Sequence, residues 1–390
     1  MVEVLLLIGF VVAAFVGYNI GGATTGPAFG PAVGAGVISK AGAAALMSIF
    51  FFIGAGTLGQ RVVTTLGEDL ITGADVFTLE TSIIVLFFIG GALFVGNFAG
   101  VPASTSMTAV GAIAGLGLAT GSLDRAVMGE IAIWWLVAPI IGFWVAGVVG
   151  RYFYPTIDRW VAIESTDGAL FEFDRSGTIP RPVLGPNTTR RELFGGFVVI
   201  AIGCLMAFSS GTSNIANAIA PLVALDSVEM TPMILLGSAA VAVGAFTIAR
   251  RTLDTLGNDI TELPLTAAIV VAVVSSGIVI SLSAVGIPAS FVIIATMSIV
   301  GLGWGRATRT VTVKQGISGK KEPSVSVGAL KADEVADSEI GEGNPADIPS
   351  AADLFNPTTS ARVVLMQNVV PILSTVGALV TFWLLFTFVW

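Results

Sequence analysis

The chain has 390 residues, of which 54% are hydrophobic and only 11% are charged, with a net charge of −8. Soluble domains carry about 25% charged residues, so this composition excludes a water-soluble globule. The chain has no histidine and one cysteine, Cys204. This excludes disulfides within the chain and argues against zinc, haem and iron–sulfur sites. We therefore expect a membrane protein without cofactor, metal site or catalytic residues, and not an enzyme.

Charge-free stretches predict the membrane segments, because a helix needs roughly 20 apolar residues to cross a bilayer. They cover residues 4–39, 41–60, 81–123, 131–150, 193–225, 230–249, 263–305 and 363–390. Two of them, 81–123 and 263–305, are too long for one crossing, and each has a Pro-Ala-Ser sequence near its middle. We expect each to be a full span followed by a re-entrant or broken helical hairpin. The fold class expected is an all-α polytopic membrane protein with two inverted repeats.

Two hydrophilic segments divide the chain into parts. The first, 151–193, is rich in arginine, and the second, 306–361, is acidic and has little to bury, so we expect it to be largely disordered. Membrane repeat 1 is then 1–150, and repeat 2 comprises 194–305 and a last transmembrane helix at 362–390. The positive-inside rule places both hydrophilic segments in the cytoplasm. The N-terminus should lie outside a cell (plasma) membrane.

An internal repeat supports two halves of opposite orientation. Gln60 to Asp69 aligns without gaps on Arg250 to Asp259, with shared Arg, Thr-Leu-Gly and Asp positions. Pro102-Ala103-Ser104 recurs as Pro288-Ala289-Ser290. The short link after the first copy corresponds to the long loop after the second, and charge bias puts these two connections on opposite sides. Inverted repeats of this kind place the substrate near the midplane, where the repeats meet.

Polar residues gather in four clusters inside the charge-free stretches. Hydroxyl and amide groups there supply hydrogen-bond donors, and helices broken beside Gly and Pro would add N–H groups and dipole ends that suit an anion. No carboxylate interrupts the clusters, so we predict a donor-rich pocket for a small oxyanion. Helix packing is the alternative, because Ser and Thr also bond to the preceding turn. The candidate substrate-binding residues are Asn19, Thr24, Thr25, Ser104, Thr105, Ser106, Thr212, Ser213, Asn214, Asn217 and Ser290.

These motifs resemble the inorganic phosphate transporter (PiT) family. Its duplicated Gly-Ala-Asn-Asp-Val-Ala-Asn-Ala signature is matched by Gly211 to Ala218 and, in degenerate form, by Gly21 to Ala28. Its Pro-Val-Ser-Thr-Thr-His element is matched by Pro102 to Met107. The resemblance implies inverted repeats, re-entrant hairpins and an anion held between them. Both signature aspartates are replaced, by Thr24 and Asn214, and the pattern is similar to the sulfate-permease branch of the family.

The lost aspartates favour sulfate as the substrate. Phosphate near neutral pH carries protons and benefits from a carboxylate acceptor, whereas sulfate only accepts hydrogen bonds. A buried carboxylate facing sulfate would be costly. We expect a secondary active sulfate transporter that works by alternating access and is coupled to H⁺ or Na⁺.

Other functions and partners stay open at this point. A phosphate transporter, a passive anion channel and a membrane scaffold are the alternatives. The partners expected are the oxyanion (sulfate, with phosphate or thiosulfate as alternatives) and the lipid bilayer, with a homodimer as a further alternative and no nucleic acid.

Overall fold

The computed structural model describes residues 2–34, 36–73, 75–99, 103–161, 171–174, 181–184, 190–225, 227–249, 265–307 and 357–389. The membrane helices and their extensions are α1 (Val2–Gly34), α2 (Lys40–Gly56), α3 (Gly59–Thr64), η1 (Thr65–Asp69), α4 (Leu79–Phe98), α5 (Thr105–Thr120), α6 (Arg125–Val148), η2 (Val149–Phe153), α7 (Tyr154–Val161), α8 (Arg190–Val223), α9 (Met230–Phe246), α11 (Leu265–Ala284), α12 (Phe291–Ala307) and α15 (Pro357–Phe388). Both η1 and η2 are short π-helical turns.

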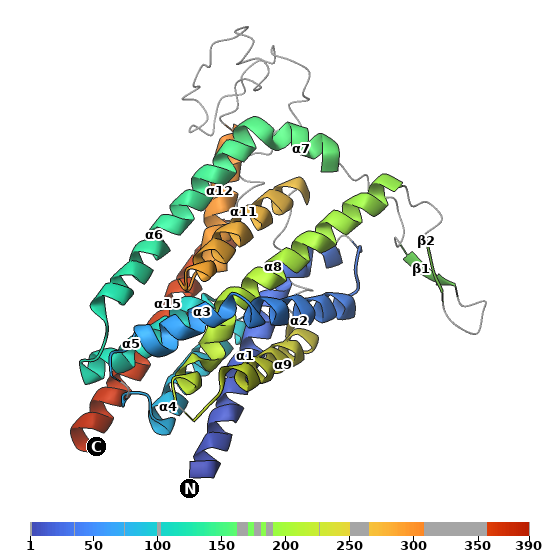
Figure 1. Cartoon of the computed structure of the whole chain (residues 1–390). Helices are drawn as coiled ribbons and strands as arrows, with labels where there is room; N and C mark the ends of the chain where they lie inside the picture. Colours follow the sequence, from blue (N-terminus) through green and yellow to red (C-terminus); the bar gives the residue numbers. More distant parts are fainter. Residues whose placement is uncertain are drawn as a thin grey trace.

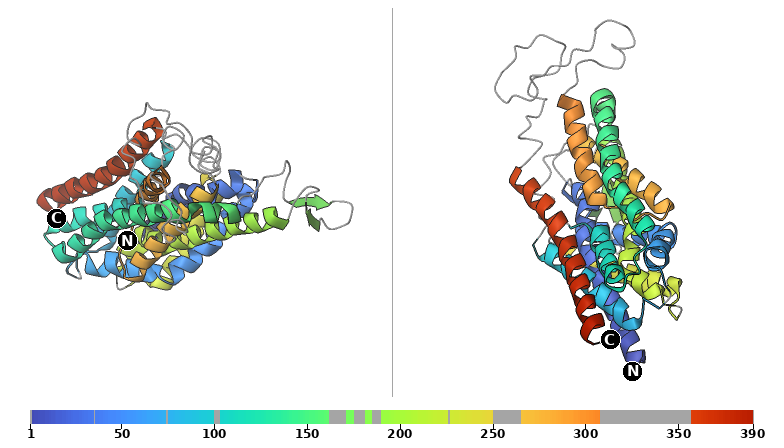
Figure 2. Two further views of the ribbon diagram at one scale, coloured as in Figure 1. Left: turned by 90° about the horizontal axis from the view of Figure 1, so that it is seen from above. Right: turned by 90° about the vertical axis from the view of Figure 1, so that its left-hand side faces the viewer.

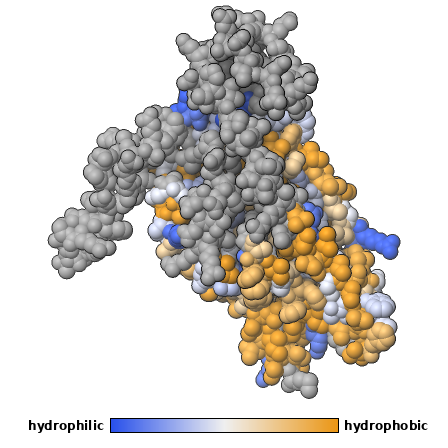
Figure 3. All heavy atoms as spheres, turned by 180° about the vertical axis from the view of Figure 1, so that it is seen from behind, coloured by the Kyte–Doolittle hydropathy of each residue, from blue (hydrophilic) through white to orange (hydrophobic). Residues whose placement is uncertain are grey.

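The helices are those of a multi-pass membrane protein. Within the described ranges, six are long and apolar enough to cross a membrane, or seven if α2 and α3, bent by 63°, form one span. Helices α5, α9 and α12 are shorter and also apolar. Apolar side chains cover much of the described surface, as lipid-facing helices require (Figure 3). Leu136 on α6, for example, is 71% exposed. The predicted all-α polytopic fold is confirmed.

Both ends of the chain lie at the same end of the helix bundle (Figures 1 and 2). Helix α1 runs away from that end, whereas α8 runs towards it (Figure 1). The same opposition holds for α6 and α15. Helix α7 and the end of α12 lie at the far end of the bundle. These directions support an inverted arrangement of the two halves.

Several helices of each half pack mainly on helices of the other half. Helix α1 packs on α9 and α2 packs on α8, while α5 packs on α15 and α12 packs on α6. At the α1–α9 crossing, a side chain on Gly21 would meet the carbonyl of Val241, and one on Gly244 would meet the carbonyl of Tyr18. Small residues of this kind let two helix backbones approach closely in a membrane. The reciprocal packing supports the predicted inverted repeats, which stay a prediction.

The chain leaves helical geometry where the Pro-Ala-Ser sequences predict it. Helix α4 ends at Phe98 and α5 begins at Thr105, and α11 ends at Ala284 while α12 begins at Phe291. We call the described residues of these two connections the first bend (99 and 103–104) and the second bend (285–290).

The polar clusters of α1 and α8, by contrast, do not break their helices. Pro27, Pro31 and Pro221 lie inside continuous helices. The expectation of breaks at these clusters is wrong. A proline in a membrane helix removes one backbone hydrogen bond, and packing against neighbouring helices lets the helix continue on both sides.

The first hydrophilic segment contains more regular structure than the sequence indicates. Helix α6 continues through η2 into α7, and two short antiparallel strands, β1 (Phe171–Asp174) and β2 (Arg181–Leu184), follow. Helix α8 then begins at Arg190 and α15 at Pro357, both slightly before the expected boundaries. Most of the segment predicted to be disordered, 306–361, lies outside the described residues.

Candidate functional site

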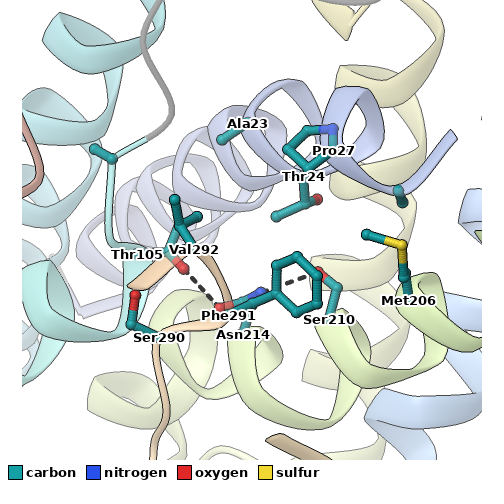
Figure 4. Close-up of a pocket in the computed structure, with 12 residues that line it drawn as sticks. Ala23, Thr24, Pro27, Thr105, Met206, Ser210, Asn214, Ser290, Phe291 and Val292 are labelled. Carbon is teal, nitrogen blue, oxygen red and sulfur yellow. Dashed lines mark hydrogen bonds between the residues drawn. The ribbon is translucent and has the colours of Figure 1, made fainter. Parts of the chain in front are cut away.

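Four elements converge on a cavity of about 30 Å³ inside the helix bundle. They are the second half of α1, the start of α5, the middle of α8 and the start of α12, so each half of the chain supplies two of them (Figure 4). The cavity is lined by Ala23, Thr24, Pro27, Ala28, Ala103, Thr105, Met206, Ser210, Asn214, Ser290, Phe291 and Val292. Four of the predicted site residues are in this lining: Thr24, Thr105, Asn214 and Ser290.

Asn214 is the centre of the hydrogen-bond network at the cavity. The Thr105 hydroxyl donates to its Oδ1 at 2.6 Å, and Asn217 Nδ2 donates to the same oxygen at 3.3 Å. With its acceptor occupied, Asn214 turns its amide nitrogen to Ser210 Oγ, at 2.9 Å. Ser210 accepts this bond, which leaves its own hydroxyl hydrogen available to donate. The cavity therefore presents a hydroxyl and an amide as donors.

Ser106 and Ser213 support the second bend rather than line the cavity. Both hydroxyls donate to the carbonyl of Ala289, at 3.0 and 2.9 Å. The backbone N–H of Ala289 in turn donates to Ser213 Oγ at 3.3 Å. Ser290, the next residue, lines the cavity and accepts from the N–H of Ile293 at 3.5 Å. The predicted residues on α5 and α8 thus fix the backbone from which Ser290 reaches the cavity.

Other predicted residues join helices outside the cavity lining. Asn97 Nδ2, near the end of α4, donates to the carbonyl and the side-chain oxygen of Asn19, at 2.9 and 3.0 Å. Thr212 donates to Ser283 Oγ, near the end of α11, at 3.1 Å. The first bond joins α4 to α1 and the second joins α11 to α8. Each lies just before the bend that ends α4 or α11. Asn19 and Thr212 therefore lie at helix–helix contacts and not in the cavity lining.

Three further predicted residues make local contacts. Thr25 is buried and donates to the carbonyl of Gly21 at 2.7 Å, which is the back-bonding expected of a helix-packing residue. Ser104 caps α5 by accepting from the N–H of Met107 at 3.3 Å. Asn217 is buried beside Asn214, and its Oδ1 has no hydrogen-bond partner among the described residues. These three lie near the cavity without lining it.

The electrostatics of the cavity favour an anion. The N-termini of α5 and α12 both begin at it, and a helix N-terminus carries about half a positive charge. Of the described residues, none that lines the cavity carries a carboxylate. Backbone N–H groups at helix N-termini bind oxyanions directly. The cavity therefore has the charge and the donors for a small oxyanion.

The remaining lining residues are apolar. Met206, Phe291 and Val292 lie among the polar lining residues, with Val292 next to Thr105 and the Phe291 ring next to Asn214 and Ser210 (Figure 4). Sequence reasoning did not select Ser210, although it lies in the same polar cluster as Asn214. The sequence does not identify Met206 or Phe291 as lining residues, because apolar residues occur throughout the membrane segments.

Comparison with known proteins identifies the family. The phosphate transporter family model matches residues 20–320. The chain belongs to the phosphate transporter family. It is therefore a multi-pass membrane transporter of an inorganic anion and not an enzyme, which confirms the predicted family and class.

Individual relatives differ in what they carry. The chain is 30% identical over 305 residues to the sulfate permease CysP of Bacillus subtilis (strain 168), covering 77% of this chain and 78% of that one. It is 24% identical over 392 residues to the chloroplastic inorganic phosphate transporter 2-1 of Arabidopsis thaliana, covering 78% of this chain and 66% of that one. A solved sodium-dependent phosphate transporter has the same fold, with a TM-score of 0.68 over 99% of this chain and 100% of the other, at 17% identity.

Proposed function

We propose that this member of the family is a secondary carrier of sulfate, bound at the cavity between α1, α5, α8 and α12. The observation that carries the proposal is the chemistry of the cavity lining. Its polar side chains are Thr24, Thr105, Ser210, Asn214 and Ser290, all hydroxyls or an amide. Sulfate has four oxygens that accept hydrogen bonds and no proton to donate near neutral pH. The Thr24 and Thr105 hydroxyls already donate to the Ile20 carbonyl and to Asn214 Oδ1, so Ser210, Asn214 and Ser290 are the donors that match this requirement.

The residue type at position 214, asparagine and not aspartate, is the feature that most distinguishes a sulfate site from a phosphate site. An aspartate there would face the bound anion and leave two negative charges in a low-dielectric site, which is costly. Phosphate offsets that cost by donating its remaining proton to the carboxylate, and sulfate does not. The uncharged amide of Asn214 avoids this cost and therefore favours sulfate. The 30% identity to the sulfate permease of Bacillus subtilis is in keeping with that choice.

The placement of the cavity supports alternating access. Helices α1 and α5 come from the first half of the chain, and α8 and α12 from the second. A site between two repeats becomes accessible from either side when one repeat moves against the other. We propose that H⁺ or Na⁺ drives uptake across the plasma membrane, with the N-terminus outside and the segments 151–193 and 306–361 in the cytoplasm.

Phosphate is the second candidate, because relatives such as the Arabidopsis protein are named as phosphate transporters. A passive anion channel and a scaffold are the further alternatives. The cavity lies inside the helix bundle between elements of the two halves, a placement that favours a carrier over an open channel.

Uptake into proteoliposomes tests the proposal. Purified protein is reconstituted, and entry of radiolabelled sulfate is measured against unlabelled phosphate, thiosulfate and molybdate. Saturable uptake with counterflow, unaffected by phosphate, supports a sulfate carrier. Uptake that phosphate blocks favours the phosphate alternative, and non-saturating flux favours a channel. Imposed Na⁺ and pH gradients in the same vesicles identify the coupling ion.

A further inference from the structure

Helix α11 ends at Ala284, and a Schellman motif closes its last turn at the start of the second bend. Gly286 has a φ of +82°, the left-handed conformation that glycine adopts without strain. The N–H of Ile287 donates to the carbonyl of Leu282 at 2.9 Å, and the N–H of Gly286 donates to that of Ser283 at 3.0 Å. These bonds satisfy two of the last carbonyls of α11. The carbonyl of Ala284 is not one of them.

The carbonyl of Ala284 needs a donor from outside its own helix. In a continuing α-helix it would accept from the N–H of the fourth residue along the chain. That residue is Pro288, which has no N–H. The last carbonyls of a helix also carry a partial negative charge, so a cationic donor suits this position best.

Arg61, from the first half of the chain, supplies that donor. It lies in α3, and its guanidinium Nη1 donates to the carbonyl of Ala284. It is the one charged residue of α3, which together with α2 and η1 is apolar enough to form one broken span. A charged side chain in such a segment is costly, and it is usually paired with a polar group or a backbone carbonyl. The bond to the end of α11 meets that need.

Helix α3 and η1 also lie directly against the beginning of the second bend. A side chain on Gly286 would meet Thr65 Oγ1 at 2.7 Å and the carbonyl oxygen of Arg61 at 3.4 Å. The Thr65 hydroxyl in turn donates to the carbonyl of Arg61 at 3.2 Å. The start of the bend therefore rests on the backbone and side chains of the first half.

The end of the second bend is held by the first half as well. Trp135 in α6 donates its indole N–H to the carbonyl of Pro288 at 3.0 Å. Ser106 in α5 donates to the carbonyl of Ala289 at 3.0 Å. Ser290, the next residue, lines the substrate cavity. The bend that carries Ser290 is thus bonded to first-half side chains at both of its ends.

Ser290 depends on these bonds because it lies between two cavities. It lines the substrate cavity and also a second, smaller cavity of about 10 Å³, beside Trp135 and Ile293. Close packing is what normally fixes a buried side chain, and a residue that borders open space on two sides has less of it. The position of Ser290 is therefore set largely by the backbone of the bend.

We propose that Arg61 is a positioning residue of the transport site. It does not line the cavity and acts through the second bend. By holding the end of α11, it fixes the point from which residues 285–289 run to Ser290. Without this bond the Ala284 carbonyl loses its donor, and the bend holds Ser290 less firmly in the geometry that binds the anion. The effect on transport rests on the proposed function, whereas the effect on the bend does not.

The first test measures the bend itself. Arg61→Met removes the donor and keeps a long side chain, and Arg125→Met, at the exposed first residue of α6, is the matched control. In nanodiscs, hydrogen–deuterium exchange of amides 285–291 should accelerate about three- to tenfold in Arg61→Met and stay as in the wild type in Arg125→Met. Arg61→Lys keeps a cationic donor and should retain most of the protection.

Two outcomes of this test overturn the proposal. One is equal exchange in Arg61→Met and the wild type, and the other is equal acceleration in Arg61→Lys and Arg61→Met. Arg61→Gln is a milder change that removes the charge and shortens the side chain. It should give an intermediate acceleration, and it tests the same bond if Arg61→Met does not insert.

The second test measures transport. Because the bend positions Ser290, Arg61→Met should raise the KM for sulfate about threefold with little change in maximal rate, and Arg61→Lys should bring the KM back towards the wild-type value. A fall in maximal rate with an unchanged KM overturns the positioning role. Absence of sulfate uptake by the wild type overturns the proposed function alone, because the exchange measurement does not depend on it.

Discussion

Thr105 and Asn214 join the two halves of the chain through a short hydrogen bond, from the Thr105 hydroxyl to Asn214 Oδ1 at 2.6 Å (Figure 4). Both side chains are buried, at 7% and 4% exposure. The bond decides which way the amide of Asn214 faces. Its oxygen is turned to α5 and its nitrogen towards Ser210, so the site presents a donor to the cavity.

Asn214→Asp tests that orientation. The carboxylate still accepts from Thr105 but loses the donor to Ser210, and it places an unpaired charge beside the anion. Such burial costs several kcal/mol, and 1.4 kcal/mol is a factor of ten, so sulfate kcat/KM should fall at least about tenfold. Asn368→Asp, at an exposed position of α15 outside the cavity lining, is the control. Unchanged sulfate kinetics in Asn214→Asp would contradict the requirement for a donor.

Phe291→Thr tests the apolar part of the cavity lining. The change removes a ring beside Asn214 and adds a hydroxyl, which gives a protonated anion a further partner. One hydrogen bond contributes about 0.5–1.5 kcal/mol, so competition by phosphate should strengthen roughly two- to tenfold. Competition is measured as the inhibition constant of phosphate against labelled sulfate. Ile293→Thr, on the smaller cavity, should leave that constant as in the wild type.

Gly244→Ala tests the crossing of α1 and α9. The added methyl group meets the carbonyl of Tyr18, and such overpacking costs about 1–3 kcal/mol. The thermal unfolding midpoint in detergent should drop by several degrees. Gly91→Ala on α4 is the matched control, since its added methyl group has no atom within 4 Å. A drop of equal size in both variants would contradict the close crossing.

Deletion of residues 323–350 tests the acidic segment. Its composition gives it little to bury, so its loss should leave sulfate uptake within about twofold of the wild type. Uptake is compared at equal amounts of reconstituted protein. Loss of uptake with normal insertion would instead reveal a role of this segment in gating or partner binding.

The sequence predicts the membrane fold well because its signals are local. Charge-free stretches mark the helices, and the two Pro-Ala-Ser sequences mark the bends that separate α4 from α5 and α11 from α12. The predicted helix breaks at the polar clusters were wrong, since α1 and α8 continue through their prolines. Whether a proline breaks a helix depends on packing against neighbouring helices, and a single sequence does not contain that information.

The site itself is only partly predictable. Thr24, Thr105, Asn214 and Ser290 line the cavity as predicted, but Asn19 belongs to a helix–helix contact with Asn97. Polarity in an apolar stretch indicates that a side chain needs a partner, and it does not say whether the partner is a ligand or another helix. Trp135 shows the same limit, because a tryptophan in a membrane segment suggests the lipid interface.

The packing of α1 on α9 has a consequence for how the protein is made. Helix α1 leaves the ribosome long before α9, its principal partner in the second half. During synthesis the face of α1 around Gly17 and Gly21, which contacts α9 in the folded protein, stays in the membrane without its final neighbour. Neither half therefore matures alone, and chaperoning of the first helices by the insertion machinery should limit the yield of folded protein.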